Sequence, residues 1–487
     1  MNWQQILKKP SLLNQGILID GKWLIDNRET FAINNPATGE IIAQVAKATD
    51  EDLNLAVTSA ELAMVKWRKL AAKERSKILR KFADLLVENA DDLATILTLE
   101  QGKPLIEARG EIIYGASYLE WYAEEAKRVY GETIPANNSN QRILIQKEPI
   151  GVCAAITPWN FPNAMLSRKI APALASGCSI IAKPASQTPL STTALAYLAL
   201  EVGVPAGVFN VVHGHSGKIG EFFCSHPSIR KLSFTGSTEV GVWLYQNSAN
   251  TMKKLSLELG GNAPLIVFPD ADLDIAIDGI IKSKFRNAGQ TCVCSNRIFV
   301  HNSIKERLVR ELYERVSQLK VGNGLESGIE IGPLIDEKAV IHAQSLISDA
   351  IKNNAKIIYG GKIDERLGGL FFQPTLVECP STDLRLFKEE IFAPILACYG
   401  FDSDEEVVKL ANDTPYGLAS YFFSRDIGRI YKVAEELKYG IVGVNTGLIS
   451  AENVPFGGVK MSGLGREGGS LGINEYLSYK YICIDIS

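Results

Sequence analysis

The sequence predicts an α/β protein with a doubly wound, Rossmann-type parallel sheet, a second α/β domain and a small β arm. From residue 151 onward, strand-like and helix-like segments alternate, which is typical of a parallel sheet covered by helices on both faces. After residue 260 a second alternation runs to about residue 446. A chain of 487 residues is also too long for one hydrophobic core, so two or three domains are expected.

The segments before the first alternation change character twice. Residues 17–46 read as short strands with turns, and residues 50–128 carry the amphipathic spacing of helices. A Pro/Asn/Ser loop at 135–140 then leads into QRILIQKEPIGV, which alternates like a strand and is expected to leave the globular body. We expect this segment and the strand-like C-terminal tail to form an arm that adds to a neighbouring subunit's sheet, because an unpaired edge strand is a liability.

The two alternations assign the strands of the two main sheets. In the first, GVCAAITPWN, CSIIAKPA, GVFNVV and KLSFTGS are strands, each followed by a helix. The helix after CSIIAKPA is expected to have Thr188 as its N-cap and Pro189 in its first turn. In the second, the strands are APLIVF, RIFVH, KIIYGG, FFQPTLVE, ILACYGF, ASYFFS and GIVGVN.

Composition argues against several classes of function. The net charge is -4 and there is no Arg-rich arm or zinc-finger spacing, so nucleic acid is not an expected partner. The N-terminus lacks the apolar core of a signal peptide and no apolar run is long enough to cross a bilayer, so no membrane is expected. Eight scattered cysteines do not form a disulfide framework, which favours the cytoplasm. The five histidines lack ligand spacing and predict no metal site.

Residues 285–297, FRNAGQTCVCSNR, hold two cysteines in a small polar turn between a helix and a strand. A thiol at such a junction can be exposed and its thiolate is a nucleophile, so Cys292 is a candidate catalytic residue. The alternative for a lone cysteine is a small buried residue. Cys294 could close a reversible disulfide with Cys292 under oxidation, although such a bridge is strained, and a small buried residue is again the alternative.

Two polar side chains at predicted strand ends complete this chemistry. Asn160 in TPWNFP follows a strand, where open parallel sheets place their ligands, and its amide can donate to a developing oxyanion. Glu258 in LELGGNAP stands between apolar residues and two glycines, and partial burial makes such a carboxylate a base that works near neutral pH. The alternatives are a locally bonded Asn in a Pro-rich turn and a Glu in a salt bridge.

Three further stretches suggest a nucleotide cofactor. Lys183 in IIAKPASQTPLS could bind ribose hydroxyls or a phosphate, and Ser186 avoids the repulsion between an acidic residue and a 2′-phosphate, which favours NADP. Gly236 and Ser237 lie between a strand and a helix N-terminus, where backbone N–H groups can meet a pyrophosphate. In KEEIFAPI, two side chains on one face could bind a ribose and pack on a cofactor ring: Glu390 and Phe392. Solvated or structural roles are the alternatives for each stretch.

The motifs PWNFP, KPAS, FTGST, LELGGNAP, GQTC, EEIF and PFGGVKMSGLGRE occur in the order and approximate spacing of the aldehyde dehydrogenase superfamily, which the chain resembles over nearly its whole length. The resemblance implies that Cys292 is the nucleophile, Glu258 the general base and Asn160 the oxyanion donor, helped by the backbone N–H of Cys292. It implies an NADP cofactor, with NAD possible, and these contacts: Thr157, Trp159, Lys183, Ser186, Gly236, Ser237, Glu390 and Phe392.

The chain departs from the superfamily's pattern at two positions. Ala393 stands where glycine is usual, which we expect to shift the loop behind Phe392 slightly. Ser186 stands where NAD-preferring members commonly have glutamate, which argues against a strict NAD preference.

Residues and resemblance agree on one reaction. A thiolate adds to an aldehyde, the tetrahedral adduct gives up a hydride to the nicotinamide, and the base activates water to hydrolyse the thioester that remains. Within the superfamily the chain most resembles succinate-semialdehyde dehydrogenases. The alternative class is a catalytically silent, oligomeric binding or structural protein that keeps this fold.

Three residues are similar to the carboxylate clamp of that group: Arg168, Arg286 and Ser450. The two arginines lie close in sequence to Asn160 and Cys292, and two guanidinium groups suit a distal carboxylate. We therefore expect a short ω-carboxy aldehyde, with succinate semialdehyde first, and glutarate semialdehyde or a broader range of short aldehydes as alternatives. A surface charge or a structural ion pair is the alternative for each arginine.

The resemblance also divides the chain. Residues 1–128 and 148–257 are expected to form a dinucleotide-binding domain, residues 258–446 a catalytic domain, and residues 129–147 with 470–487 the oligomerisation arm of a homodimer or homotetramer.

Overall fold

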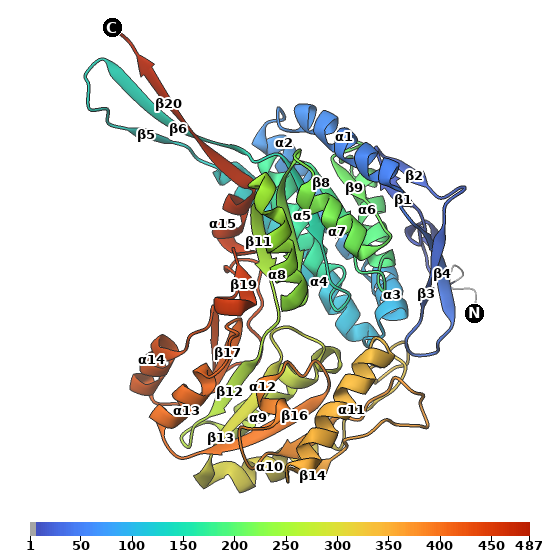
Figure 1. The fold of residues 1–487 in the computed structure, drawn as a ribbon, viewed down its shortest axis with the longest axis vertical. Coiled ribbons are helices and arrows are strands. Elements are labelled where there is room, and N and C mark those ends of the chain that lie inside the picture. Colours follow the sequence, from blue (N-terminus) through green and yellow to red (C-terminus); the bar gives the residue numbers. More distant parts are fainter. Residues whose placement is uncertain (1–5) are drawn as a thin grey trace.

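The computed structural model describes residues 6–487 and contains two large sheets, each covered by helices, with an arm that projects from the body (Figure 1). The first sheet has the strand order β19-β11-β10-β7-β8-β9-β1-β2. Its parallel strands are β7 (Val152–Ile156), β8 (Ile180–Lys183), β9 (Phe209–Val211), β10 (Ile229–Thr235) and β11 (Lys254–Glu258). Its antiparallel strands are β1 (Ile17–Ile19), β2 (Lys22–Leu24) and β19 (Gly463–Leu464).

The order of the parallel strands places a switch point at the centre of this sheet. They run β9-β8-β7-β10-β11, so the direction in which the chain builds the sheet reverses between β7 and β10. Doubly wound sheets bind ligands beyond the carboxyl ends of their strands at such a point. The predicted α/β fold class with a Rossmann-type sheet is therefore confirmed.

Both faces of the first sheet are buried, because side chains alternate along its strands. Cys153 and Ala155 of β7 join one apolar cluster, and Val152 and Ala154 join another. The helices of the first cluster are α2 (Ala72–Glu88), α3 (Ala90–Gln101), α4 (Leu105–Glu125), α5 (Ala164–Ser176) and α6 (Leu190–Glu201). Those of the second are α1 (Asp50–Trp67), α7 (Ser216–Ser225) and α8 (Thr238–Ser248).

The start of α6 corrects one prediction. Thr188 is not the N-cap: the helix begins at Leu190, and the Thr188 hydroxyl has no hydrogen-bond partner among the described residues. Instead the Glu100 carboxylate of α3 accepts the backbone N–H groups of Leu190 and Ser191, at 2.7 and 2.8 Å. A carboxylate from a distant helix therefore satisfies the N–H groups that a local cap would have taken.

The second sheet has the strand order β14-β15-β16-β13-β12-β17-β18 and is parallel except for the β14–β15 pair. The strands are β12 (Ala263–Val267), β13 (Ser295–His301), β14 (Lys356–Tyr359), β15 (Thr375–Glu378), β16 (Ile395–Phe401), β17 (Ala419–Phe423) and β18 (Ile441–Val444). The helices of this region are α9 (Leu273–Phe285), α10 (Asn302–Val316), α11 (Glu337–Lys352), α12 (Arg385–Lys388), α13 (Asp404–Asn412) and α14 (Ile427–Glu436). The Cys292 turn connects α9 to β13 through the 3₁₀ turn η5 (Arg286–Gly289).

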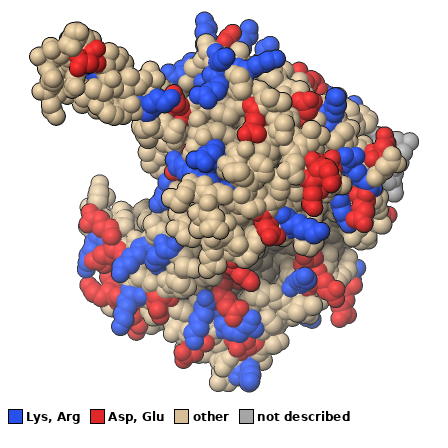
Figure 2. All heavy atoms as spheres, turned by 45° about the horizontal axis from the view of Figure 1, so that its top comes forward, with Lys and Arg blue, Asp and Glu red and all other residues tan. Residues whose placement is uncertain are grey.

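The arm is an antiparallel sheet of β5 (Glu132–Ile134), β6 (Gln141–Pro149) and β20 (Leu477–Asp485), and both views show it standing away from the body (Figures 1 and 2). The strand β20 pairs with β6 over its whole length. Residues 469–476, which the sequence assigns largely to the arm, are instead helical turns, α15 (Gly469–Gly472) and η7 (Ile473–Tyr476). Ile473 and Tyr476 are buried in the apolar cluster between the first sheet and the helices α2 to α6, so the projecting strand starts only at Leu477.

Two smaller features complete the fold. The strands β3 (Thr30–Asn34) and β4 (Ile41–Ala46) form a separate hairpin near the N-terminus. Lysine and arginine are interspersed with aspartate and glutamate on the face shown in Figure 2. Over residues 6–487, no helix has the length and apolar character that a bilayer crossing requires.

Candidate active site

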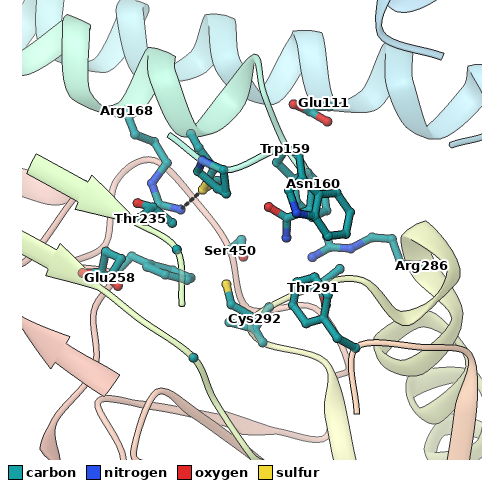
Figure 3. A pocket seen from close by; sticks show the side chains of 18 of the residues that line it. Glu111, Trp159, Asn160, Arg168, Thr235, Glu258, Arg286, Thr291, Cys292 and Ser450 are labelled. Atoms are coloured by element: carbon teal, nitrogen blue, oxygen red, sulfur yellow. Dashed lines mark hydrogen bonds between the residues drawn. The ribbon is translucent and has the colours of Figure 1, made fainter. Parts of the chain in front are cut away.

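A cavity of about 580 Å³ collects most of the predicted site residues (Figure 3). Its walls come from α4, the loop after β7, the start of α5, the carboxyl ends of β10 and β11, and the Cys292 turn. The predicted residues that line it are Trp159, Asn160, Arg168, Gly236, Ser237, Glu258, Arg286, Cys292, Glu390, Phe392 and Ser450. Those that do not are Thr157, Lys183, Ser186 and Cys294.

Cys292 is partly exposed at the end of a tight turn. Asn287 and Ala288 have φ values of +51° and +54°, a left-handed conformation that is unusual for alanine. The turn is held by buried hydrogen bonds from Gln101 Nε2 to Asn287 Oδ1 (2.9 Å) and from Gln290 Nε2 to Asn287 O (3.1 Å). Burial raises the pKa of the Cys292 thiol to about 12, although the charge of Arg168 acts in the opposite direction.

Asn160 is buried and its amide is oriented. Its Nδ2 donates to the backbone carbonyl of Gln290 at 2.9 Å, which uses one of two N–H groups and leaves the other available. The backbone carbonyl oxygen of Asn160 accepts hydrogen bonds from Lys103 Nζ (2.7 Å) and Asn287 Nδ2 (2.9 Å). The backbone and the side chain of Asn160 are therefore both held in place. No described acceptor takes the backbone N–H of Cys292.

Glu258 is the last residue of β11 and is buried more deeply than the predicted partial burial. Neither of its carboxylate oxygens has a hydrogen-bond partner among the described residues. Burial, followed by the negative charge of Glu467, raises the pKa of Glu258 well above its usual value, and the charges of Arg168 and Lys169 oppose that rise. A carboxyl group in these surroundings can exchange a proton near neutral pH.

Arg168 combines the two roles that the sequence offers as alternatives. Its side chain is 2% exposed, and its Nε lies 3.0 Å from Glu467 Oε2, so it forms a buried ion pair. Its guanidinium also lies over the Phe456 ring at 4.1 Å, and Nη1 contacts Met165 Sδ at 3.5 Å. It nevertheless lines the pocket, and its Nη2 has no hydrogen-bond partner among the described residues.

Arg286 and Ser450 complete the predicted clamp. Arg286 lies over the Phe161 ring at 5.3 Å, and no described residue forms a hydrogen bond or ion pair with its guanidinium. Figure 3 shows Arg168 and Arg286 on opposite sides of the pocket, with Ser450 and Cys292 between them in this view. Two guanidinium groups and a hydroxyl thus line one pocket, and each is a group that can bind an anion.

Three of the residues outside the pocket, Thr157, Lys183 and Ser186, lie along the carboxyl edge of the first sheet. Thr157 directly follows β7, and its backbone N–H donates to the carbonyl of Lys183, at the end of β8, at 3.2 Å. Lys183 Nζ is buried and donates to Ser216 Oγ at 2.6 Å, and burial lowers its pKa to about 8. Ser186 lies in the turn after β8. A polar strip thus continues from the pocket along the edge.

The wall between this strip and Cys292 suits a flat, polar ligand. Ser237 caps α8 by accepting the N–H of Val240 at 3.4 Å. Glu390 Oε1 accepts the N–H of Gly261 at 3.0 Å, and burial raises the pKa of Glu390 to about 7. Phe392 has φ +49° and meets Trp159 edge to face, with ring centroids 5.6 Å apart. A helix N-terminus, a buried ammonium and aromatic walls fit a dinucleotide along this path.

Four buried charged residues around the site escaped the sequence analysis. Lys103 and Glu111 form an ion pair of 2.6 Å, and Glu111 also accepts the N–H of Asn163 at 2.9 Å. Lys169 and Glu467 form a second buried pair. Glu467 is the last residue of the motif PFGGVKMSGLGRE, which signals the family but assigns Glu467 no role. Nothing in the sequence indicates that Lys103 and Glu111 are buried, since a charged residue in a helical region is normally solvated.

Cys294 is buried beneath the turn that carries Cys292. Its Sγ lies 3.6 Å from the Lys284 carbonyl oxygen, and both thiols are free. Burial raises the pKa of Cys294 as well. The redox role of Cys294 stays a prediction.

Comparisons with known proteins agree with this arrangement. Residues 23–482 match the sequence model of the aldehyde dehydrogenase family. The chain is 53% identical to succinate-semialdehyde dehydrogenase [NADP(+)] of Escherichia coli, over 99% of this chain and 100% of that protein. It is also 53% identical to glutarate-semialdehyde dehydrogenase of Pseudomonas aeruginosa, over 98% and 99%. The crystal structure of succinate-semialdehyde dehydrogenase from Burkholderia pseudomallei superposes with a TM-score of 0.97 at 54% identity, over 98% and 99%.

Proposed function

Because the chain belongs to the aldehyde dehydrogenase family, we propose that it oxidises succinate semialdehyde to succinate with NADP. The observation that carries this proposal is the pocket in which a cysteine, a buried carboxyl group and an oriented amide share space with two arginines. The first three groups suit aldehyde oxidation, and the arginines suit a substrate with a second, negatively charged end.

In the proposed reaction Cys292 Sγ attacks the aldehyde carbon and forms a thiohemiacetal. Asn160 Nδ2 and the backbone N–H of Cys292 donate to the oxygen that becomes negative. A bound NADP would supply the acceptor for the hydride that this adduct gives up. Glu258, having released to solvent the proton that it took from the Cys292 thiol, then takes a proton from water, which attacks the thioester. The C–S bond breaks, Cys292 leaves as the thiolate, and the acid is released. Each group thus acts on an atom that changes charge or bonding partner.

The cofactor strip supports NADP over NAD. Lys183 supplies a buried ammonium with a single hydroxyl partner, and the neighbouring Ser186 carries no negative charge. An acidic side chain at that turn would repel a 2′-phosphate, whereas serine can donate to it. Glu390 is placed to accept from ribose hydroxyls, and Trp159 and Phe392 to flank the ring system.

Variants of the clamp residues test the clamp, because they should lose the preference for an aldehyde with a carboxylate over a neutral aldehyde. Arg168→Ala and Arg286→Ala should each lower kcat/KM for succinate semialdehyde about 10- to 100-fold, because each removes a charge-assisted contact to the carboxylate. The loss for propanal should be much smaller in Arg286→Ala, and in Arg168→Ala it should be limited to the effect of the lost charge on Glu258 and Cys292. Arg366→Ala, which removes an arginine 86% exposed at the surface, is the matched control and should change neither value. Equal losses on both aldehydes would exclude the clamp.

Glutarate semialdehyde is the second candidate, because an equally similar relative carries that name. Its extra methylene changes the distance between aldehyde and carboxylate but not the groups at either end. Steady-state kinetics with both semialdehydes, each with NADP and with NAD, separate these candidates. A higher kcat/KM for the five-carbon substrate would reverse the proposed order.

The proposed assembly is a homo-oligomer, a dimer or a tetramer, formed through the arm. The arm projects from the body, and its outer strand β20 leaves one edge unpaired in the described residues of this protomer. Side chains of Tyr479 and Tyr481 on that strand are 62% and 61% exposed. An open edge and exposed aromatic rings both favour pairing with a second copy of the chain.

A further inference from the structure

The ion pair between Arg168 and Glu467 connects the proposed clamp to the proposed base. Glu467 Oε2 lies 3.0 Å from Arg168 Nε, and Glu467 Oε1 pairs with Lys169 Nζ. Lys169 Nζ also donates to Thr235 Oγ1 at 2.7 Å. Thr235 lies opposite Glu258 in the register of β10 and β11. A buried chain of contacts therefore runs from the clamp to Thr235, the residue beside the base on the neighbouring strand.

Glu467 also determines which part of Arg168 faces the pocket. The backbones of Phe456 and Glu467 exchange hydrogen bonds of 2.7 and 2.8 Å, so side chains from a paired segment meet one guanidinium. Phe456 covers its face at 4.1 Å, Glu467 pairs with Nε, and Met165 Sδ contacts Nη1 at 3.5 Å. Nε contacts Glu467 as an ion pair and not as a hydrogen bond, whereas Nη2 is buried and has neither kind of partner among the described residues, so Nη2 is left for an anion in the pocket.

We propose that Arg168 holds Glu467 and the substrate carboxylate at the same time, so that an anion in the clamp retunes the base Glu258. This inference rests on the proposed function, because it requires the clamp to bind the carboxylate. Of the cations near Glu258, Arg168 lowers its pKa most, against burial and Glu467. An anion on Arg168 offsets that positive charge, so Glu258 holds its proton more tightly with an ω-carboxy aldehyde than with a neutral one.

The other charged groups nearby do not depend on which aldehyde is bound. Glu258 faces Arg168, Lys169, Arg466, Glu467 and Cys292, and Glu467 also faces Lys231, Tyr118, Tyr122 and Tyr476. Of these cations only Arg168 lines the pocket. Among these cations, Arg168 is therefore the one that an anionic substrate in the pocket can engage.

Proton uptake on binding tests the proposal without catalysis. Butane-1-sulfonate carries a fixed negative charge, so calorimetry in two buffers of different ionisation enthalpy counts the protons that the Cys292→Ala enzyme takes up. We expect fractional uptake at some pH between about 6 and about 9, and none when Glu258→Gln is added. Binding without uptake overturns the coupling and leaves the clamp intact. No binding of the anion overturns the clamp, and the coupling with it.

Two variants should shift the base in opposite directions. Arg168→Met removes a positive charge near Glu258, whereas Glu467→Gln removes a negative charge and keeps an oxygen acceptor for Arg168. With butanal as substrate, we measure the rate of acyl-enzyme hydrolysis as a function of pH. The acidic limb of this pH–rate profile should move to higher pH by about 1 unit in Arg168→Met and to lower pH in Glu467→Gln. The steady rate after the NADPH burst measures this limb.

The directions of these two pH shifts distinguish electrostatic coupling of Glu258 to its charged neighbours from structural damage. Glu125→Gln, a buried carboxylate of α4 that pairs with Arg128, is the matched control and should leave the limb unchanged. Shifts of one sign in both variants, or no shift, overturn the coupling. Butanal has no carboxylate, so this measurement holds even if the preferred substrate is another aldehyde.

Discussion

At the scale of single residues, Cys292 combines a reactive position with a thiol that holds its proton firmly. Burial raises its pKa to about 12, and the charge of Arg168 is the largest influence in the other direction. Since the thiolate is the nucleophile, little of the free enzyme is reactive at neutral pH. The proton must therefore leave during the attack, and Glu258 is the raised-pKa carboxyl group in the same pocket.

The pH dependence of Cys292 alkylation measures directly how firmly the thiol holds its proton. In the cofactor-free enzyme, the rate at which iodoacetamide modifies Cys292 should rise about tenfold per pH unit from about pH 7 to about pH 10, because the thiolate fraction is still growing below a raised pKa. Arg168→Met should be slower at each pH, since it removes the opposing charge. Mass spectrometry of the Cys292 peptide gives the rate. A plateau below about pH 9 would contradict the raised pKa.

At the scale of elements, the connection between β11 and β12 packs directly against the Cys292 turn. A Cβ on Gly261 would lie 2.6 Å from the Cys292 carbonyl oxygen, closer than real side chains approach a backbone atom. Gly261 also donates its N–H to Glu390. One glycine thus sets the spacing between the backbone of Cys292, the proposed nucleophile, and Glu390, a proposed cofactor contact.

Gly261→Ala should therefore lower kcat about 100-fold while the protein stays folded, because a displacement of the nucleophile of about 1 Å is enough for such a loss. Gly369→Ala is the matched control: a Cβ there meets nothing within 4 Å. Steady-state kinetics and thermal unfolding of both variants give the comparison. Full activity in Gly261→Ala would show that the turn adjusts without moving Cys292.

Elements were predictable from sequence where the signal is local. The alternation of strands and helices predicted both sheets, because buried strands followed by capped helices leave a periodic pattern. The start of α6 was not predictable, since its N–H groups are satisfied by Glu100 from another helix. The turns at 469–476 were missed for a similar reason: Ile473 and Tyr476 are buried by contacts with distant segments.

The candidate site shows the same limit. Asn160 follows β7 and Glu258 ends β11, and the carboxyl ends of parallel strands converge, so their proximity could be anticipated. Cys292 stands in the turn before β13 of the other sheet, and only the resemblance implied that it joins them. The ion pair of Arg168 with Glu467 could not be anticipated, because it depends on how a segment far along the chain returns to α5. The sequence pattern of each partner alone is that of a solvated charge.

At the scale of the whole molecule, the arm is the part that the fold of one protomer leaves without a partner. Its three strands project from the body, while the pocket lies between the two large sheets. Alternate residues of a strand share a face, so Tyr479 and Tyr481 present two neighbouring aromatic rings. The proposed assembly and the pocket therefore use different surfaces.

Replacing both Tyr479 and Tyr481 with glutamate should convert the proposed oligomer to smaller species, because like charges are then brought together at the arm. Sedimentation velocity measures the mass distribution, and circular dichroism checks that the protomer stays folded. Tyr431→Glu is the matched control, since that tyrosine is 67% exposed but lies on α14. An unchanged oligomer in the arm variant, or a monomeric parent protein, would move the subunit contacts away from this strand.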